Sequence, residues 1–186
     1  MFGIAPGTAA DFENLNAFVA EAIKDAFYRP DLTPEEITEN ERIVSIAERT
    51  AREAVAHPHR AVFVAKDDAT LAGFVIVDGT DQAMPEIDWL IVGPPWQGKG
   101  VAHRLMAQAL AWIAREAGAG VPVQLGVIHF NERAIAFYRK WGFEDTGRTH
   151  GRHRIPRRMM VRAATADGLS ATREKSGAGD CPGGRA

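Results

Sequence analysis

The sequence predicts an α/β protein of the α+β kind, in which strands and helices follow one another along the chain. Its 186 residues, 46% of them hydrophobic, fit one domain with a real core. Short apolar runs separated by turn signals are typical of strands, and stretches with apolar residues at helical spacing lie between them. At residues 87–102 an apolar run, a glycine-rich turn and an amphipathic helix follow one another directly, as in a strand–turn–helix unit.

In the first third of the chain, the pattern predicts an edge strand and two helices. Residues 2–5 are a short apolar start. Thr8 is a suitable N-cap for a first helix, in which apolar residues recur at helical spacing as far as Ile23. Thr33, with proline in the next position, begins a second helix that is expected to run to about Val55.

The rest of the chain alternates between strands and helices. The predicted elements are strands at 60–65, 71–77 and 86–92, a helix at 98–117, a strand at 121–128, a helix at 131–141, and a final hairpin of strands at 143–149 and 154–162. The order is therefore strand, two helices, three strands, helix, strand, helix and hairpin. Residues 1–163 form the predicted domain. Residues 164–186 are rich in small and charged residues and are expected to be disordered.

The turn Gln97-Gly98-Lys99-Gly100 lies where a helix begins. Helix N-termini carry unpaired N–H groups and the positive end of a dipole, so this turn suits a phosphate or pyrophosphate. A nucleotide-binding P-loop is disfavoured because Gly100 takes the place of its serine or threonine, and Pro94 and Pro95 remove two donors. The dinucleotide fingerprint G-x-G-x-x-G is absent.

Two segments carry a family resemblance. Residues 97–102, Gln-Gly-Lys-Gly-Val-Ala, follow Leu90-Ile-Val92 and Pro94, and the segment 131–143 reads Asn-Glu-Arg-Ala-Ile-Ala-Phe-Tyr-Arg-Lys-Trp-Gly-Phe. Together, in this order and with one helix and one strand between them, they resemble the acetyl-CoA signature and the later motif of the GCN5-related N-acetyltransferases (GNAT family). At motif level the resemblance spans residues 86–143, and as architecture it spans about 2–163.

The resemblance implies the acyl-CoA N-acyltransferase fold. Its mixed central sheet, flanked by helices, is splayed between the fourth strand, ending at Val92, and the fifth, ending at Ile128, with the pantetheine arm in the gap. Acetyl-CoA would be the co-substrate, and no metal is implied. The cofactor-binding residues implied by the motifs are Leu90, Ile91, Val92, Gln97, Gly98, Lys99, Gly100, Val101, Ala102, Asn131, Phe137 and Tyr138.

Tyr138 is the acid implied by the resemblance, because the family's tyrosine at this point protonates the coenzyme A thiolate. A tyrosine with an ordinary pKa of about 10 keeps its proton at neutral pH. The alternative is an aromatic side chain that only packs beside Phe137 and Phe143. Asn131 resembles the asparagine that hydrogen-bonds pantetheine, and it is also a natural N-cap for the short helix.

Glu86 and Asp88 are the candidate bases. They alternate with apolar residues, so both carboxylates are expected on one side of their strand. Glu86 stands six residues before Val92, where some relatives place a catalytic glutamate. A water chain, or two carboxylates that are merely solvated or ion-paired, are the alternatives. His103 and His129 are candidates by residue type only.

The acceptor site is not encoded by a motif. The last hairpin is basic, with Arg148, His150, Arg152, His153, Arg154, Arg157, Arg158 and Arg162. This pattern is compatible with a solvated face, with an acceptor that carries a carboxylate or phosphate, or with nucleic acid. A net charge of −2 argues against a molecule built as a whole for nucleic acid.

The sequence therefore predicts a cytoplasmic, acetyl-CoA-dependent N-acetyltransferase that transfers acetyl directly to a primary amine of a small molecule. A protein or peptide amino-group acetyltransferase is the alternative, followed by a non-catalytic coenzyme A-binding regulator. The lone Cys181 excludes an internal disulfide, and no apolar run approaches a membrane span. The start of the chain lacks a basic-then-apolar signal. Homodimers are common in the family, although no interface is visible in the sequence.

Overall fold

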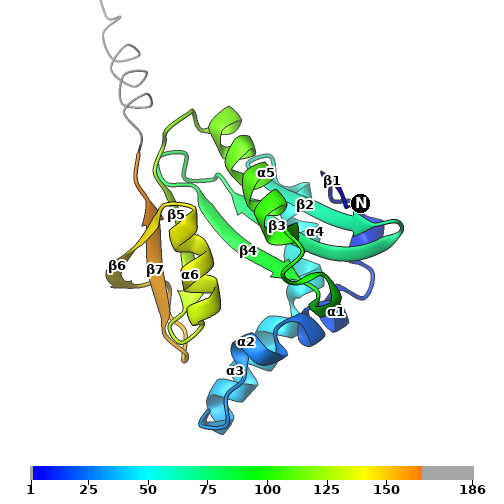
Figure 1. The fold of residues 1–186 in the computed structure, drawn as a ribbon, viewed down its shortest axis with the longest axis vertical. Coiled ribbons are helices and arrows are strands. Elements are labelled where there is room, and N and C mark those ends of the chain that lie inside the picture. Colours follow the sequence, from blue (N-terminus) through cyan, green and yellow to red (C-terminus); the bar gives the residue numbers. More distant parts are fainter. Residues whose placement is uncertain (1, 165–186) are drawn as a thin grey trace, which may run out of the picture.

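The computed structural model of the protein describes residues 2–164 and shows a seven-stranded mixed sheet in the order β1-β2-β3-β4-β5-β7-β6 (Figure 1). The strands are β1 (Gly3–Pro6), β2 (Arg60–Asp67), β3 (Thr70–Asp78), β4 (Glu86–Val92), β5 (Val123–Ile128), β6 (Phe143–Thr149) and β7 (Arg157–Arg162). The helices are α1 (Leu15–Ala22), α2 (Lys24–Phe27), α3 (Pro34–Ser45), α4 (Ala47–Ala56), α5 (Val101–Glu116) and α6 (Glu132–Lys140). The predicted α+β class is confirmed. The predicted tail lies outside the described residues, apart from Ala164.

The helices cover the two faces of the sheet separately. One face packs on α5 and α6, and its buried residues include Phe63, Val75, Val77, Ile87, Leu105, Met106, Ile113, Leu125, Ile135 and Met160. The opposite face packs on α1 and α4 through Phe12, Leu15, Val19, Ala47, Ala51, Val62, Val64, Phe74 and Ile76. The even-numbered and odd-numbered residues of β2 thus go to different cores, as the two-residue period of a strand requires.

The sheet opens between β4 and β5. All other neighbouring strands pair antiparallel, whereas β4 and β5 are parallel and pair only at Glu86↔Gln124 and Ile87↔Leu125. Beyond these residues the two strands diverge (Figure 1). The splay expected from the family resemblance is therefore confirmed, and it leaves the second half of β4 without a neighbouring strand on its β5 side.

The prediction of a single helix from Thr33 to about Val55 is wrong. The structure has two helices in this segment, α3 and α4, which are separated at Ile46. Asn16, on α1, stabilises the break with both ends of its side-chain amide. Its Nδ2 donates to the Ser45 carbonyl at 3.0 Å, and its Oδ1 accepts from the Glu48 N–H at 2.9 Å. These are groups that a helix break leaves without intrahelical partners. The break therefore depends on a tertiary contact.

The first predicted helix is also divided. A 3-10 turn, Ala9–Phe12, precedes α1, and Asn14 between them adopts a left-handed conformation with φ 63°. Asparagine tolerates that conformation better than most residues. The other boundaries differ from the prediction by a few residues, as helix and strand ends commonly do.

Candidate active site

The glycine turn joins β4 to α5 through a short 3-10 segment, Pro94–Trp96. Gly98 and Gly100 have φ values of 75° and 84°, which glycine adopts without strain. A Cβ added at either position would meet no atom within 4 Å, so the space above this backbone is open.

The turn has several free donors. Within residues 2–164, the N–H groups of Gly98, Gly100, Val101 and Ala102 meet no acceptor, whereas Lys99 N–H donates to Trp96 O at 3.3 Å. Unpaired donors at a helix N-terminus, approachable from open space, fit the pyrophosphate of coenzyme A. The residues present are therefore suited to the predicted cofactor.

Gln97 bridges the two sides of the splay. Its Nε2 donates to the Val92 carbonyl at 3.1 Å, and its Oε1 accepts from Arg133 Nη1, on α6, at 2.8 Å. The side chain is thus already engaged, and it places the Arg133 guanidinium beside the glycine turn. Arg133 occupies an unspecified position of the sequence motif. The motif therefore does not indicate that the Arg133 side chain lies next to the glycine turn.

The edge of β4 that faces β5 presents free main-chain groups. Gly93 N–H donates to Ala72 O at 3.0 Å, toward β3. Because successive residues of a strand direct these groups to opposite edges, Ile91 also faces β3, whereas Leu90 and Val92 face the gap. The Gln97 contact with Val92 O lies on that side. The edge therefore offers the N–H groups of Leu90 and Val92.

On the other side of the gap, α6 carries the predicted Asn131, Phe137 and Tyr138. Asn131 Oδ1 accepts the Ala134 N–H at 3.1 Å, so Asn131 is the N-cap of α6. Phe137 lies 5.0 Å from the His103 ring, centroid to centroid, so α6 packs beside the first turn of α5. The helix thus brings Phe137 to the first turn of α5.

Tyr138 packs edge-on against Phe137 at 5.5 Å and Phe143 at 6.1 Å. Its ring is half-buried, and no described residue hydrogen-bonds its hydroxyl. Burial raises the pKa of Tyr138 from 10.0 to about 12. The hydroxyl therefore carries its proton throughout the neutral range, and it is free to donate it.

Glu86 is the first residue of β4, and two side chains hold its carboxylate in place. His150 Nε2 lies 2.9 Å from Glu86 Oε1, and Gln124 Nε2 donates to Oε2 at 3.3 Å. The hydrogen bond to Glu86 raises the pKa of His150, against an opposing effect of burial. The sequence identified His150 only as one of several basic residues, because its contact with Glu86 depends on how the last hairpin folds back.

Asp88 belongs to a second charged cluster on the same face. Arg60 lies between two carboxylates, with Nη2 3.2 Å from Asp88 Oδ2 and Nε 3.0 Å from Asp78 Oδ2. Burial, and then the neighbouring Glu86, raise the pKa of Asp88 to about 6. Both candidate carboxylates are thus part-buried and ion-paired, and the expectation that they lie on one side of β4 agrees with these contacts.

The basic residues of the last hairpin are not equivalent. Arg158 pairs with Asp145 at 3.1 Å, and His153 Nδ1 lies 3.2 Å from Glu39 Oε1 on α3. Burial lowers the pKa of His153. His103 and His129 make ring contacts with Phe137 and Phe130, respectively, which agrees with structural roles.

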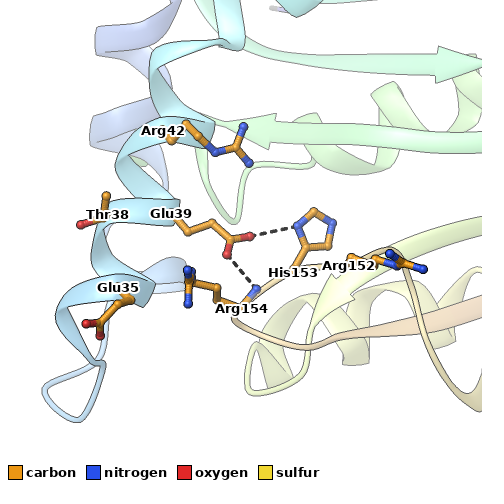
Figure 2. A pocket seen from close by; sticks show the side chains of 7 residues that line it. All are labelled: Glu35, Thr38, Glu39, Arg42, Arg152, His153 and Arg154. Carbon is orange, nitrogen blue, oxygen red and sulfur yellow. Dashed lines mark hydrogen bonds and ion pairs between the residues drawn. The ribbon is translucent and has the colours of Figure 1, made fainter.

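A cavity of about 540 Å³ opens between α3 and the β6–β7 connection (Figure 2). Its lining residues are Glu35, Thr38, Glu39, Arg42, Arg152, His153 and Arg154. The carboxylate of Glu39 crosses between the two walls, where it meets His153 and accepts the Arg154 N–H at 2.7 Å. These residues come from α3 and from the β6–β7 connection, which are far apart in the sequence, so no local pattern indicates that they share a cavity.

Solved structures share this fold. The PaiA N-acetyltransferase of Thermoplasma acidophilum in complex with coenzyme A is 20% identical, with a TM-score of 0.69, and the match covers 88% of this chain and 99% of that one. The spermidine N-acetyltransferase of Vibrio cholerae in complex with coenzyme A and spermine is 19% identical, with a TM-score of 0.60 and coverage of 86% and 94%. The fold is that of the acyl-CoA N-acyltransferases.

The chain belongs to the acetyltransferase (GNAT) family, which it matches over residues 18–143. It is 36% identical over 113 residues to an uncharacterised N-acetyltransferase of Mycobacterium tuberculosis, covering 59% of this chain and 71% of that protein. It is 30% identical over 123 residues to the N-alpha-acetyltransferase RimI of the same organism, with coverage of 64% and 70%.

Mycothiol acetyltransferase of Brachybacterium faecium is 39% identical over 92 residues, 47% of this chain and 27% of that protein. The protein is accordingly an N-acetyltransferase that uses acetyl-CoA, as the enzymes of its family do. In the part of the chain that the structure describes, no helix is long and apolar enough to cross a membrane.

Proposed function

We propose that this N-acetyltransferase acts directly on a primary amine of a small molecule, with both substrates bound in the splay between β4 and β5. The observation that carries this proposal is the free edge of β4. It lies between the glycine turn at one end and the pair Glu86 and Asp88 at the other. A cofactor that lies along this edge can thus extend from the turn toward the carboxylates.

Cofactor binding is assigned to the turn, β4 and α6. The N–H groups of Gly98, Gly100, Val101 and Ala102 hold the pyrophosphate, and the guanidinium of Arg133 adds positive charge beside them. Acetyl-CoA supplies a thioester whose carbonyl carbon is the electrophile. The main-chain N–H groups of Leu90 and Val92 orient the pantetheine arm and the thioester oxygen. Donors aimed at a developing negative charge are typically worth about 3–4 kcal/mol.

The proton donor is Tyr138. Its hydroxyl has no competing hydrogen bond from the described residues, and it is protonated at any working pH because its pKa is about 12. Burial also makes Tyr138 a weaker acid than an ordinary tyrosine. Its proton transfer must therefore accompany the departure of the thiolate and cannot precede it.

The proton acceptor is Glu86, with Asp88 as the neighbouring carboxylate. His150 and Gln124 fix the orientation of Glu86 with contacts of 2.9 and 3.3 Å. Asp88, with a pKa of about 6, is largely ionised at neutral pH and adds negative charge that attracts an ammonium group. The acceptor nitrogen loses its proton at this end of β4 before it attacks.

A small-molecule acceptor is favoured by the size of the cavity between α3 and the β6–β7 connection. Its volume of about 540 Å³ lies in the range of about 300–1,000 Å³ that is usual for small-ligand sites. Two of the proteins similar to this chain are named for small substrates, mycothiol and spermidine. The similarity to RimI keeps a protein α-amino group as the alternative acceptor.

The test has two stages. The midpoint of thermal unfolding is first measured with saturating acetyl-CoA, with ATP and Mg²⁺, and with neither. A ligand at 100 times its dissociation constant adds about 2.7 kcal/mol, so acetyl-CoA is expected to raise the midpoint by about 5–10 °C. Release of free thiol is then followed with a panel of amines. Turnover of peptides alone would contradict the small-molecule assignment, and binding without any turnover would indicate a regulator.

A further inference from the structure

We propose that Arg157 binds an anionic group, a carboxylate or a phosphate, carried by the small-molecule acceptor next to its reactive amine. This inference rests on the proposed function, because it concerns the same acceptor. It assigns a specificity role to a residue that belongs to neither family motif.

The hairpin places Arg157 beside the candidate base. The His150 N–H donates to the Arg157 carbonyl at 2.8 Å, so these two residues are paired across β6 and β7. Side chains of directly paired residues project from the same face of a sheet. The imidazole of His150 contacts Glu86 at 2.9 Å, and the guanidinium of Arg157 is therefore its neighbour on the face that carries the carboxylates.

Arg157 differs from the three carboxylates that act on it in having no direct partner among the described residues. Glu86 is paired with His150, Asp88 with Arg60, and Glu39 with His153. Within residues 2–164 no hydrogen bond or ion pair reaches the Arg157 guanidinium, although Asp88, Glu39 and Glu86 act on it from a distance. It is only half-exposed, and burial lowers its pKa, so the cation is desolvated without receiving a contact in return.

A desolvated guanidinium with free donors is a site for an anion. Its planar fork matches a carboxylate or a phosphate with two parallel hydrogen bonds. The ammonium of the acceptor is attracted by Glu86 and Asp88, whose negative charge lies on the same face. The arrangement is thus complementary to a molecule with an amine and an anion close together, such as an amino acid or an aminoalkyl phosphate.

The adjoining cavity adds positive charge of the same kind. Arg42, Arg152 and Arg154 surround the Glu39–His153 pair (Figure 2), and within the described chain their guanidinium groups make no ion pair. Arg42 lies on α3, far from the hairpin in sequence. These exposed cations attract an anionic acceptor toward the cavity, and Arg157 is the part-buried group that binds it.

The nucleic-acid interpretation of this hairpin is less well supported. Arg158, His150 and His153 already pair with Asp145, Glu86 and Glu39. The remaining cations border a cavity that is also lined by the carboxylates of Glu35 and Glu39, which a polyphosphate backbone would have to approach. A small anion, by contrast, needs only the local guanidinium groups.

The test compares matched acceptors that differ only in the anion. Each amino acid of a standard panel is assayed against its carboxamide, and phosphoethanolamine is assayed against ethanolamine. We expect kcat/KM to be at least about tenfold higher for the anionic member of the best pair, which is the usual effect of a hydrogen bond to a charged group. The two series distinguish a carboxylate from a phosphate.

The variant Arg157→Gln is then compared with Arg115→Gln, which removes the same charge from the exposed end of α5, where Arg115 pairs with Glu116 and with no other described residue. We expect Arg157→Gln to bring the acid-to-neutral ratio of kcat/KM close to one and Arg115→Gln to leave the ratio unchanged. Arg157→Lys keeps the charge without the planar fork, and it should retain part of the preference. If Arg157→Gln does not fold, the acid-to-neutral ratio of kcat/KM in the wild type and in Arg157→Lys still tests the role of Arg157.

Failure of this inference and failure of the proposed function give different results. Turnover without preference for the anionic acceptors, an unchanged ratio in Arg157→Gln, or a peptide amide that exceeds every free amino acid would overturn the role of Arg157. If no amine is acetylated, the proposed function fails, and calorimetric titration of the same acids into the coenzyme A-bound protein tests the anion site by itself. Binding to the wild type that is lost in Arg157→Gln would support the anion site. The absence of binding to the wild type would overturn the anion site as well.

Discussion

His150 Nε2 lies 2.9 Å from Glu86 Oε1 across the point where β4 and β5 separate. Glu86 is paired with Gln124, and Gly126 follows the last residue of β5 that pairs with β4. The imidazole rests on Gly126, because a Cβ built there would stand only 2.6 Å from His150 Nδ1. A glycine in β5 thus makes room for the residue that orients the candidate base.

Gly126→Ala should therefore reduce acetyl transfer without reducing cofactor affinity. The added methyl group displaces the imidazole and frees Glu86 to rotate. We expect kcat/KM for the acceptor to fall by about tenfold, equivalent to about 1.4 kcal/mol. Gly3→Ala on β1 is the control, since a Cβ there meets nothing within 4 Å. Equal activity of the two variants would show that the position of His150 has no effect on transfer.

The Glu86–His150 pair should make stability depend on pH. The pKa of His150 is raised in the folded protein from its usual 6.5, mainly by the hydrogen bond to Glu86. Its stabilising contribution is fully present below pH 6.5 and is lost as the pH rises through the folded pKa. The difference in unfolding midpoint between wild type and His150→Gln should thus be largest near pH 6 and should shrink toward pH 8.5. A difference that grows with pH would contradict the assignment.

Tyr138→Phe should lower kcat while leaving the affinity for acetyl-CoA nearly unchanged. The substitution removes the proton donor but keeps the ring that packs between Phe137 and Phe143. General acids contribute typically about 10²–10⁴-fold, so a loss of that order is expected. The wild-type activity should also show no loss attributable to Tyr138 below about pH 11, because its pKa is about 12. A parallel loss of cofactor binding would make Tyr138 a packing residue.

Gly98→Val should weaken acetyl-CoA binding. A side chain at φ 75° is strained, and it projects into the open space through which the pyrophosphate approaches the N–H groups. Gly147→Val on β6 is a matched control, with φ 72° and likewise no atom within 4 Å of its Cβ. Calorimetry with acetyl-CoA should show at least about a tenfold loss for Gly98→Val only, consistent with lost charge-assisted hydrogen bonds. Equal affinities would remove the turn from the binding site.

The parts of the site that lie within one local unit could be predicted from the sequence. The turn after β4 and the segment 131–143 each act through backbone groups or side chains of a single strand–turn–helix or helix, so their spacing is visible in the chain. The splay between β4 and β5 came from the family resemblance. The base candidates Glu86 and Asp88 followed from the alternation of one strand.

The partners of these residues depend on chain reversal and register, which a sequence pattern does not report. Arg60 meets Asp88 across two strand pairings, and His150 meets Glu86 from the far end of the last hairpin. Arg133 lies in the motif as an unspecified position, yet α6 carries it to Gln97. The division between α3 and α4 was missed for the same reason, because its cause is the side chain of Asn16 on another helix.

The narrow junction between β4 and β5 has a consequence for cooperative folding. Within the part of the chain that the structure describes, only the strand pairs Glu86↔Gln124 and Ile87↔Leu125 join the backbone of β1–β4 to that of β5–β7–β6. Opening fluctuations of the second group can therefore break few hydrogen bonds to the first, as in separable folding units. A cofactor bonded to β4 and packed on α6 would serve as the missing strand. Substrate binding would then unite the two units into one cooperative structure, and slow amide exchange in β5 would report it.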